Sequence, residues 1–248
     1  MTDHRTPTAA TTDWVTLPTA DGPMRTYVAR PGTPADRAVI VLQEAFGVND
    51  HIQDIARRYA ARGYLALAPD LFHRNGVGTL GYEQHAEAMP LIGAIGADAI
   101  VTDVDAVLTH LAEAEGVPAA RTAVNGFCFG GRAAFTAATA ISGLAATVVF
   151  YGPGIAAGPH AVLDRAQSID APVLLHVGAE DPTIPAEQVA AIDSALKSAG
   201  VTFESYVYPG AGHAFACDAR PHMYRADPAG TAWSRTHAFL DRHLPATA

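Results

Sequence analysis

A cysteine lies at the centre of the run Gly126-Phe127-Cys128-Phe129-Gly130-Gly131. The sequence predicts an apolar strand before it, Thr122 to Asn125, and an alanine-rich helix after it. Glycines two residues before and two after a nucleophile are typical of a nucleophile elbow, a strained turn in which any Cβ at those positions would crowd the strand and helix. At a helix N-terminus, unpaired N–H groups and the helix dipole favour the thiolate. We therefore predict that Cys128 is a catalytic nucleophile; the alternative is a buried structural cysteine.

A thiol nucleophile needs a base, and the base needs a group that fixes its tautomer. His213 lies in a glycine-rich loop after the predicted strand Phe203 to Tyr208, and Asp181 lies in the loop after Pro172 to Val177. Alone, they would be interpreted as a surface histidine and an Asp-Pro turn. The chain order of nucleophile, acid and histidine is that of α/β-hydrolases, which favours a catalytic triad. Glu180 is the competing acid; we favour Asp181 because its shorter side chain suits a fixed hydrogen bond.

Glu44 follows the predicted strand Ala38 to Leu42, which is apolar throughout. A carboxylate at the end of a buried strand is costly unless it is paired or protonated. The alternative is a side chain that turns out to solvent. In α/β-hydrolases this segment donates the second N–H of the oxyanion hole, and the N–H that follows the nucleophile, here that of Phe129, donates the first. A functional role for Glu44 is therefore favoured.

The positions of these residues depend on strands that alternate with helices. This alternation predicts an α/β fold of the α/β-hydrolase type, a doubly wound and mostly parallel sheet with helices on both faces and ligands at the carboxyl ends of its strands. An opening hairpin is expected at Trp14 to Leu17 and Met24 to Ala29, with further strands at Leu65 to Ala68 and Thr147 to Tyr151. Helical periodicity is found around residues 52–60, 101–111, 186–199 and 233–240.

The chain has 248 residues, 49% of them hydrophobic, which is enough for one large domain. We expect a flexible polar tail over residues 1–12 and a single domain over residues 13–248. The net charge of −9 argues against nucleic acid and anionic membranes as partners. With no secretory signal, no membrane-length apolar run and only Cys128 and Cys217, the sequence predicts a monomeric cytoplasmic protein.

Two further patterns do not support a cofactor. Gly76-Val77-Gly78-Thr79-Leu80-Gly81 matches the dinucleotide-binding spacing, but it does not directly follow a strand, so a loop that lines the pocket is the better interpretation. The eleven histidines show no metal-binding spacing such as H-E-x-x-H. We therefore expect no metal and no cofactor.

Five segments of the chain carry a family resemblance: residues 43–49, 69–72, 126–131, 178–181 and 210–215. Together they resemble the dienelactone hydrolase family across about Val15 to Leu244. The resemblance implies that Cys128 attacks a lactone or ester carbonyl, that His213 is the acid/base and that Asp181 orients it. It also implies that Glu44 contacts the thiol region and helps to take the thiol proton when substrate binds. The N–H groups of Phe129 and Ala45 would form the oxyanion hole.

The resemblance further implies two arginines that bind a substrate carboxylate. One matches Arg74, but the position of the other, four residues after His213, is Cys217. Both positions are candidate substrate-binding residues. The sequence thus predicts a cysteine hydrolase of lactones or small esters. The alternatives are a broad carboxylesterase without a dedicated lactone, and a non-hydrolytic thiol redox or ligand-binding protein on the same fold.

Overall fold

One eight-stranded sheet organises the computed structural model, which describes residues 10–247. The strand order β1-β2-β4-β3-β5-β6-β7-β8 confirms the predicted doubly wound sheet. β1 pairs antiparallel with β2, and β2 with β4, whereas all other neighbours are parallel. The strands are β1 (Thr11–Thr19), β2 (Gly22–Arg30), β3 (Ala38–Leu42), β4 (Leu65–Pro69), β5 (Thr122–Phe127), β6 (Ala146–Phe150), β7 (Val173–Gly178) and β8 (Phe203–Tyr208).

The first strand starts earlier than predicted. β1 begins at Thr11, so residues 11 and 12 belong to the sheet and not to a polar tail. Thr11 is in register with Arg30 and Thr12 with Ala29, so the hairpin extends to the far end of β2. The first nine residues of the predicted tail lie outside the described residues.

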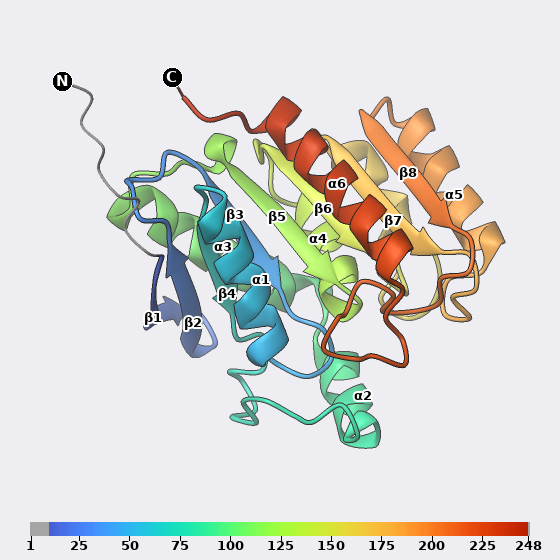
Figure 1. The fold of residues 1–248 in the computed structure, drawn as a ribbon, viewed down its shortest axis with the longest axis horizontal. Coiled ribbons are helices and arrows are strands. Elements are labelled where there is room, and N and C mark those ends of the chain that lie inside the picture. The colour runs from blue at the N-terminus through green and yellow to red at the C-terminus, as the bar shows by residue number, and fades with distance from the viewer. Residues whose placement is uncertain (1–9, 248) are drawn as a thin grey trace.

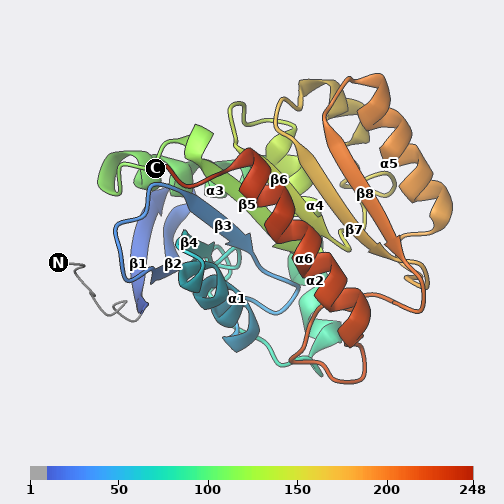
Figure 2. The same ribbon diagram turned by 45° about the horizontal axis from the view of Figure 1, so that its top comes forward.

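Helices cover both faces of the sheet, with α1 and α6 on one face and α3, α4 and α5 on the other (Figure 1, Figure 2). Within residues 10–247, none of them combines the length and the apolar composition that a membrane crossing requires. The helices are α1 (Asp50–Ala61), α2 (His85–Ala94), α3 (Ala97–Ala114), α4 (Phe129–Ala138), α5 (Ala186–Ser198) and α6 (Ala226–His243), with short 3-10 turns η1 (Ala119–Arg121) and η2 (Leu163–Ser168).

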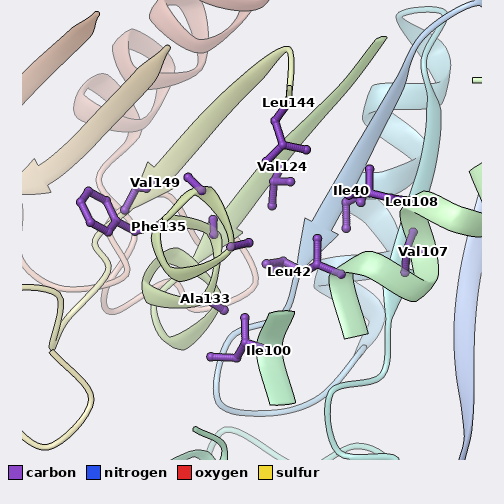
Figure 3. Close-up of a cluster of buried hydrophobic side chains, with 14 of the residues drawn as sticks. Ile40, Leu42, Ile100, Val107, Leu108, Val124, Ala133, Phe135, Leu144 and Val149 are labelled. Carbon is purple, nitrogen blue, oxygen red and sulfur yellow. The ribbon is translucent and has the colours of Figure 1, made fainter. Parts of the chain in front are cut away.

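The two helical layers explain why β3 is apolar at every position. Val39 and Val41 pack in the cluster that contains α1 and α6, whereas Ile40 and Leu42 pack in the cluster that contains α3 and α4. Figure 3 shows Ile40 and Leu42 in this second cluster, together with Val124 of β5. A strand that is buried on both faces favours apolar side chains along its whole length, and all five residues of β3 are fully buried.

Helix α2 was not predicted. It contains Pro90, which breaks the backbone hydrogen-bond pattern of a helix interior, and buries only Ala88. α2 lies beyond the carboxyl ends of the strands (Figure 1), where Ala88 packs with Ala45 and Phe46 from the segment after β3. α2 therefore covers the end of the sheet at which ligands were expected.

Candidate active site

Cys128 lies on a sharp turn between β5 and α4. Its backbone has φ 54° and ψ −118°, a conformation that residues with a side chain rarely adopt. A Cβ on Gly126 would overlap the carbonyl oxygen of Gly130, and a Cβ on Gly130 would overlap that of Leu42. The turn therefore has the strained geometry that the glycine spacing predicts, and the half-buried Cys128 caps the N-terminus of α4.

The loop after β7 carries Asp181 and the loop after β8 carries His213, and the two loops come into close contact at Gly178 and Gly212. Gly178 ends β7, and a Cβ there would lie only 2.6 Å from the carbonyl oxygen of Gly212. Oδ2 of Asp181 lies 2.7 Å from Nδ1 of His213. Asp181 is buried, whereas Glu180 is exposed. Of the two candidate acids, the partner of His213 is thus Asp181.

Thr183 holds the other oxygen of Asp181. The Thr183 hydroxyl donates to Oδ1 at 2.6 Å, and the Thr183 amide donates to the same oxygen at 2.9 Å. Burial alone would raise the pKa of Asp181, but the hydrogen bond and charge of His213 and the two bonds from Thr183 outweigh it and lower the pKa. Asp181 is therefore a fixed carboxylate at neutral pH.

His213 is in turn linked to Cys128. Burial would lower the pKa of His213, but the charge of Cys128 and the hydrogen bonds to Asp181 and Cys128 outweigh it and raise the pKa to about 10. The imidazolium form of His213 is consequently favoured at neutral pH, beside the carboxylate of Asp181. The ring of Tyr151 meets the His213 ring edge-on, with the centroids 5.3 Å apart, and limits where the imidazole can move. Such an arrangement can deliver a thiolate to a carbonyl carbon and a proton to a leaving group.

Two backbone amides are available for an oxyanion. Phe129 is the first residue of α4, and Ala45 follows Glu44 in the segment after β3. Neither amide donates a hydrogen bond to another group among residues 10–247. Both side chains are buried, so the amides belong to the well-packed part of the site. Free, fixed N–H donors are the groups that stabilise an oxyanion.

Glu44 contacts a thiol, but the thiol is that of Cys217 and not that of the expected nucleophile. Sγ of Cys217 donates to Oε2 of Glu44 at 3.7 Å and lies 3.5 Å from the Tyr82 hydroxyl. Burial and the charge of Glu44 raise the pKa of Cys217 to about 12. The pKa of Tyr151 is raised by its burial and then by the charges of Glu44, Cys217 and Cys128. Of the two thiols, the one to which Glu44 is hydrogen-bonded is that of Cys217.

The two predicted substrate-binding residues are buried or paired with other side chains of the protein. Cys217 is fully buried. Nη1 and Nη2 of Arg74 donate to the two carboxylate oxygens of Asp103 at 2.6 and 2.9 Å, and its Nε donates to Asp21 at 2.8 Å. Asp103 is itself fully buried. Arg74 therefore neutralises a carboxylate of α3, and the structure does not support the predicted binding role of either residue.

A different arginine lies close to Cys128. Arg132, in the first turn of α4, is only 6% exposed, and burial lowers its pKa while the charge of Cys128 acts in the opposite direction. Its Nη2 donates to the carbonyl of Ile92 in α2 at 3.2 Å. Arg132 and Phe129 line a cavity of about 240 Å³ between α4 and α2. The site thus has a buried cation next to the elbow.

Thr183, Tyr151 and Arg132 have no motif that marks them in the sequence. Thr183 follows Asp181-Pro182, a spacing at which a hydroxyl and an amide commonly bond an Asp side chain, so it could have been identified as part of an Asx turn. Arg132 directly follows the elbow glycines and could have been suspected for that reason. Tyr151 comes at the end of a predicted strand and carries no comparable signal.

Comparisons with known proteins identify the family of this chain. The profile of the dienelactone hydrolase family matches residues 24–244. A Yersinia pestis protein provisionally named carboxymethylenebutenolidase is 37% identical over 235 residues, which cover 92% of this chain and 87% of the relative. A Salmonella typhimurium protein with the same provisional name is 38% identical over 240 residues, which cover 93% and 87%.

Solved structures lead to the same family. The crystal structure of a Klebsiella pneumoniae protein, provisionally named a dienelactone hydrolase, superposes with a TM-score of 0.84 at 34% identity and covers 94% of this chain and 99% of that one. A Pyrococcus furiosus esterase has a TM-score of 0.72 at 19% identity, covers 94% and 91%, and shares the fold. The chain therefore belongs to the dienelactone hydrolase family and has an α/β-hydrolase fold.

Proposed function

We propose that this protein hydrolyses lactones or small esters through a covalent acyl-enzyme on Cys128. One observation carries the proposal: the imidazole of His213 lies 2.7 Å from Asp181, and it is near enough to Cys128 for the charge of that thiol to raise its pKa. A thiolate, an imidazolium and an orienting carboxylate in one line are the groups that acyl transfer requires. The names of the relatives, carboxymethylenebutenolidase and dienelactone hydrolase, support a lactone as the substrate.

In the first half-reaction, the Cys128 thiolate forms a bond to the carbonyl carbon. The carbonyl electron pair moves to oxygen, where the amides of Phe129 and Ala45 stabilise the charge. When the tetrahedral intermediate collapses, the C–O bond breaks and His213 donates its proton to the leaving alkoxide. In a lactone, this alkoxide stays attached as a hydroxyl at the other end of the acyl chain.

In the second half-reaction, His213 is neutral and takes a proton from water as the water oxygen attacks the thioester. The C–S bond then breaks, which releases the carboxylic acid and restores the thiolate beside the imidazolium. Asp181 keeps the proton of Nδ1 in place through both steps, so that Nε2 faces the reaction. Thr183 fixes Asp181 in the same orientation.

The position of Glu44 supports a role in the first half-reaction. Its carboxylate is buried, and one of its oxygens, Oε1, has no hydrogen-bond partner among residues 10–247. This oxygen is therefore free to accept a proton from a neighbouring group. We assign Glu44 as the group that takes up the Cys128 proton whenever the thiol form binds substrate.

The cavity at Phe129 and Arg132 supports a small acidic substrate. A volume of about 240 Å³ is below the usual range for drug-sized ligands. Arg132 would supply the cation for a substrate carboxylate, the role that Arg74 cannot fill. This favours a carboxylate-bearing lactone over a neutral ester, and a broad carboxylesterase is the second candidate.

Active-site labelling tests the nucleophile directly. Iodoacetamide should inactivate the enzyme with one alkyl group per chain, on the peptide that contains Cys128. Cys217 is an internal control, because it is fully buried and should remain unlabelled in the folded protein. Cys128→Ala should fold normally and lose hydrolysis of p-nitrophenyl acetate and of small lactones. Hydrolysis that persists in Cys128→Ala would disprove the proposal, and a wild type that hydrolyses neither substrate class would favour the non-hydrolytic alternative.

A further inference from the structure

Three buried side chains with metal-binding atoms lie close to one another. Glu44, His51 and Cys217 each offer one such atom, and the three atoms lie within 4.8 Å of one another. The exposed fractions of the three residues are 1%, 4% and 0%. They come from the segment after β3, the first turn of α1 and the loop before α6, which returns to α1 (Figure 1). We call these residues the Glu44–His51–Cys217 cluster.

His51 is oriented as metal-binding histidines usually are. Its Nδ1 lies 3.3 Å from Oδ1 of Asp218, and the other oxygen of Asp218 accepts a hydrogen bond from Arg58. A carboxylate at Nδ1 keeps the proton on that nitrogen and leaves the lone pair on Nε2. Histidine ligands of metal ions are commonly fixed in this way by a neighbouring carboxylate.

Hydrogen bonds within the protein do not satisfy the cluster. Nε2 of His51 and Oε1 of Glu44 are both buried, and neither has a hydrogen-bond partner among residues 10–247. Buried polar atoms are nearly always bonded, and an unpaired one is costly. The cluster contains two such atoms, and both belong to groups that can donate an electron pair. They indicate that an electron-pair acceptor belongs there.

The spacing and the atom types suit one class of ion. Tetrahedral zinc with bonds of about 2.3 Å to sulfur and 2.1 Å to oxygen holds these two atoms about 3.6 Å apart. Sγ of Cys217 and Oε2 of Glu44 are 3.7 Å apart. A thiolate, an imidazole and a carboxylate together match zinc and cobalt, and the thiolate disfavours magnesium and calcium.

We propose that Glu44, His51 and Cys217 bind a divalent ion of the zinc type, with Asp218 as the carboxylate that orients His51 and solvent as the fourth ligand. The thiol of Cys217 loses its proton as the S–metal bond forms, and no electron is transferred. Thiolate and carboxylate bring two negative charges to the ion, and the Arg220 guanidinium, near the ring of Tyr82, opposes them with one positive charge. The site shares Glu44 with the proposed acylation step, but metal binding can be measured in a variant without the Cys128 nucleophile, so its test does not depend on the proposed function.

Cobalt(II) tests the site, because cobalt bound to a thiolate gives a charge-transfer band in the near ultraviolet and tetrahedral cobalt absorbs strongly in the visible. The titration uses Cys128→Ala, in which Cys217 is the only thiol, so that any thiolate band reports this cluster. We expect one cobalt per chain and displacement by Zn²⁺. Adding Cys217→Ser should abolish the charge-transfer band, and adding Asp218→Asn, at a half-exposed position that tolerates change, should weaken binding by about 10- to 100-fold.

His222→Gln is the matched control, because the His222 side chain is exposed. In the Cys128→Ala background it should leave the band and the affinity unchanged, whereas His51→Gln should lower the affinity. Circular dichroism verifies that each variant is folded. A Cys128→Ala protein without a cobalt–thiolate band, or a band that survives in Cys217→Ser, would overturn the site. An affinity that is equal in Asp218→Asn and its parent would refute the role of Asp218.

Discussion

Nδ1 of His213 lies 2.7 Å from Oδ2 of Asp181, and the carboxylate side chain is fully buried at this contact. The two residues are 32 positions apart in the chain and meet because two loops touch at Gly178. In the folded protein the pKa of His213 is raised and the pKa of Asp181 is lowered, and each residue contributes to the shift of the other. The stability of the folded protein should therefore depend on pH in a way that can be assigned to this pair.

We expect the stabilisation from His213 to be lost at alkaline pH. Its pKa is about 10 in the folded protein and about 6.5 in an unfolded chain. The folded state therefore binds more protons between these values, so the stabilisation is complete below pH about 6.5 and disappears as the pH rises through about 10. The difference in unfolding free energy between the wild type and His213→Ala should shrink from pH 6 to pH 10, measured by urea denaturation.

His222→Gln is the control for this experiment, since its exposed ring has no acidic partner among residues 10–247. Its difference from the wild type should stay constant over the same range. If the difference between the wild type and His213→Ala were flat with pH, or grew toward pH 10, the pKa of His213 would not be raised in the folded protein.

Thr183→Val should lower kcat by about tenfold, or ~1.4 kcal/mol in the barrier, because the variant keeps the shape but loses the hydroxyl that holds Asp181. KM and the melting temperature should change little, which separates a positioning role from a structural one. Thr109→Val, at an exposed position of α3, is the matched control and should leave kcat unchanged. Equal kcat values in the two variants would show that the Thr183 amide alone suffices to orient Asp181.

Most of the sheet could be predicted from the sequence because its central strands are buried on both faces. β3 and β8 have the predicted bounds, and the other predicted strands agree within a few residues. The long apolar run of β3 leaves no alternative to a central strand. α2 could not be predicted, for two reasons. Pro90 interrupts its helical pattern, and its stability comes from packing against the segment after β3, a long-range contact that the local sequence does not indicate.

The same distinction applies to the site. Cys128, Asp181 and His213 could be located because each follows a strand at a position that the fold fixes. The ion pair between Arg74 and Asp103 could not be predicted, because Asp103 is a single polar residue on the inner side of a helix 29 positions away. The Glu44–His51–Cys217 cluster has no motif either, because its third member joins the first two only in the folded chain, 173 positions from Glu44.

Glu44→Gln should slow the acylation burst by at least about tenfold while KM stays close to its wild-type value, because an amide cannot take up the thiol proton. Stopped-flow with p-nitrophenyl acetate measures both quantities. Glu180→Gln removes an exposed carboxylate from the neighbouring loop and should leave the burst unchanged. An unaltered burst in Glu44→Gln would leave Glu44 without a role in acylation, and a slower burst in Glu180→Gln would instead indicate a general effect of charge.

Gly126→Ala should prevent stable folding or abolish activity, because its Cβ would overlap the carbonyl oxygen of Gly130. Gly230→Ala is the opposite case: no atom lies within 4 Å of its Cβ position on α6, so alanine should stabilise the protein by about 0.5–1 kcal/mol. Thermal unfolding compares the two. A Gly126→Ala variant with wild-type melting temperature and activity would show that the elbow can relax.

Substrate selectivity distinguishes the two arginines. Arg132 lines the cavity beside Phe129, whereas the guanidinium of Arg74 is fully occupied by Asp103 and Asp21. Arg132→Met should lower kcat/KM for a carboxylate-bearing lactone by about 10- to 100-fold relative to a neutral ester of similar size, which is the loss expected for a charge-assisted hydrogen bond. Ratios of kcat/KM measured on the same enzyme preparation cancel errors in the concentration of active sites.

Arg74→Met provides the contrast. It should lower the melting temperature, because Asp103 would lose most of its compensation for a buried charge, but the selectivity ratio should not change. Arg74→Lys keeps a positive charge and should recover part of the stability, so that a folded variant at this position is available for kinetics. If the selectivity ratio fell in the Arg74 variants and not in Arg132→Met, Arg74 would be the residue that recognises the carboxylate, and its bonds to Asp103 would have to open when substrate binds.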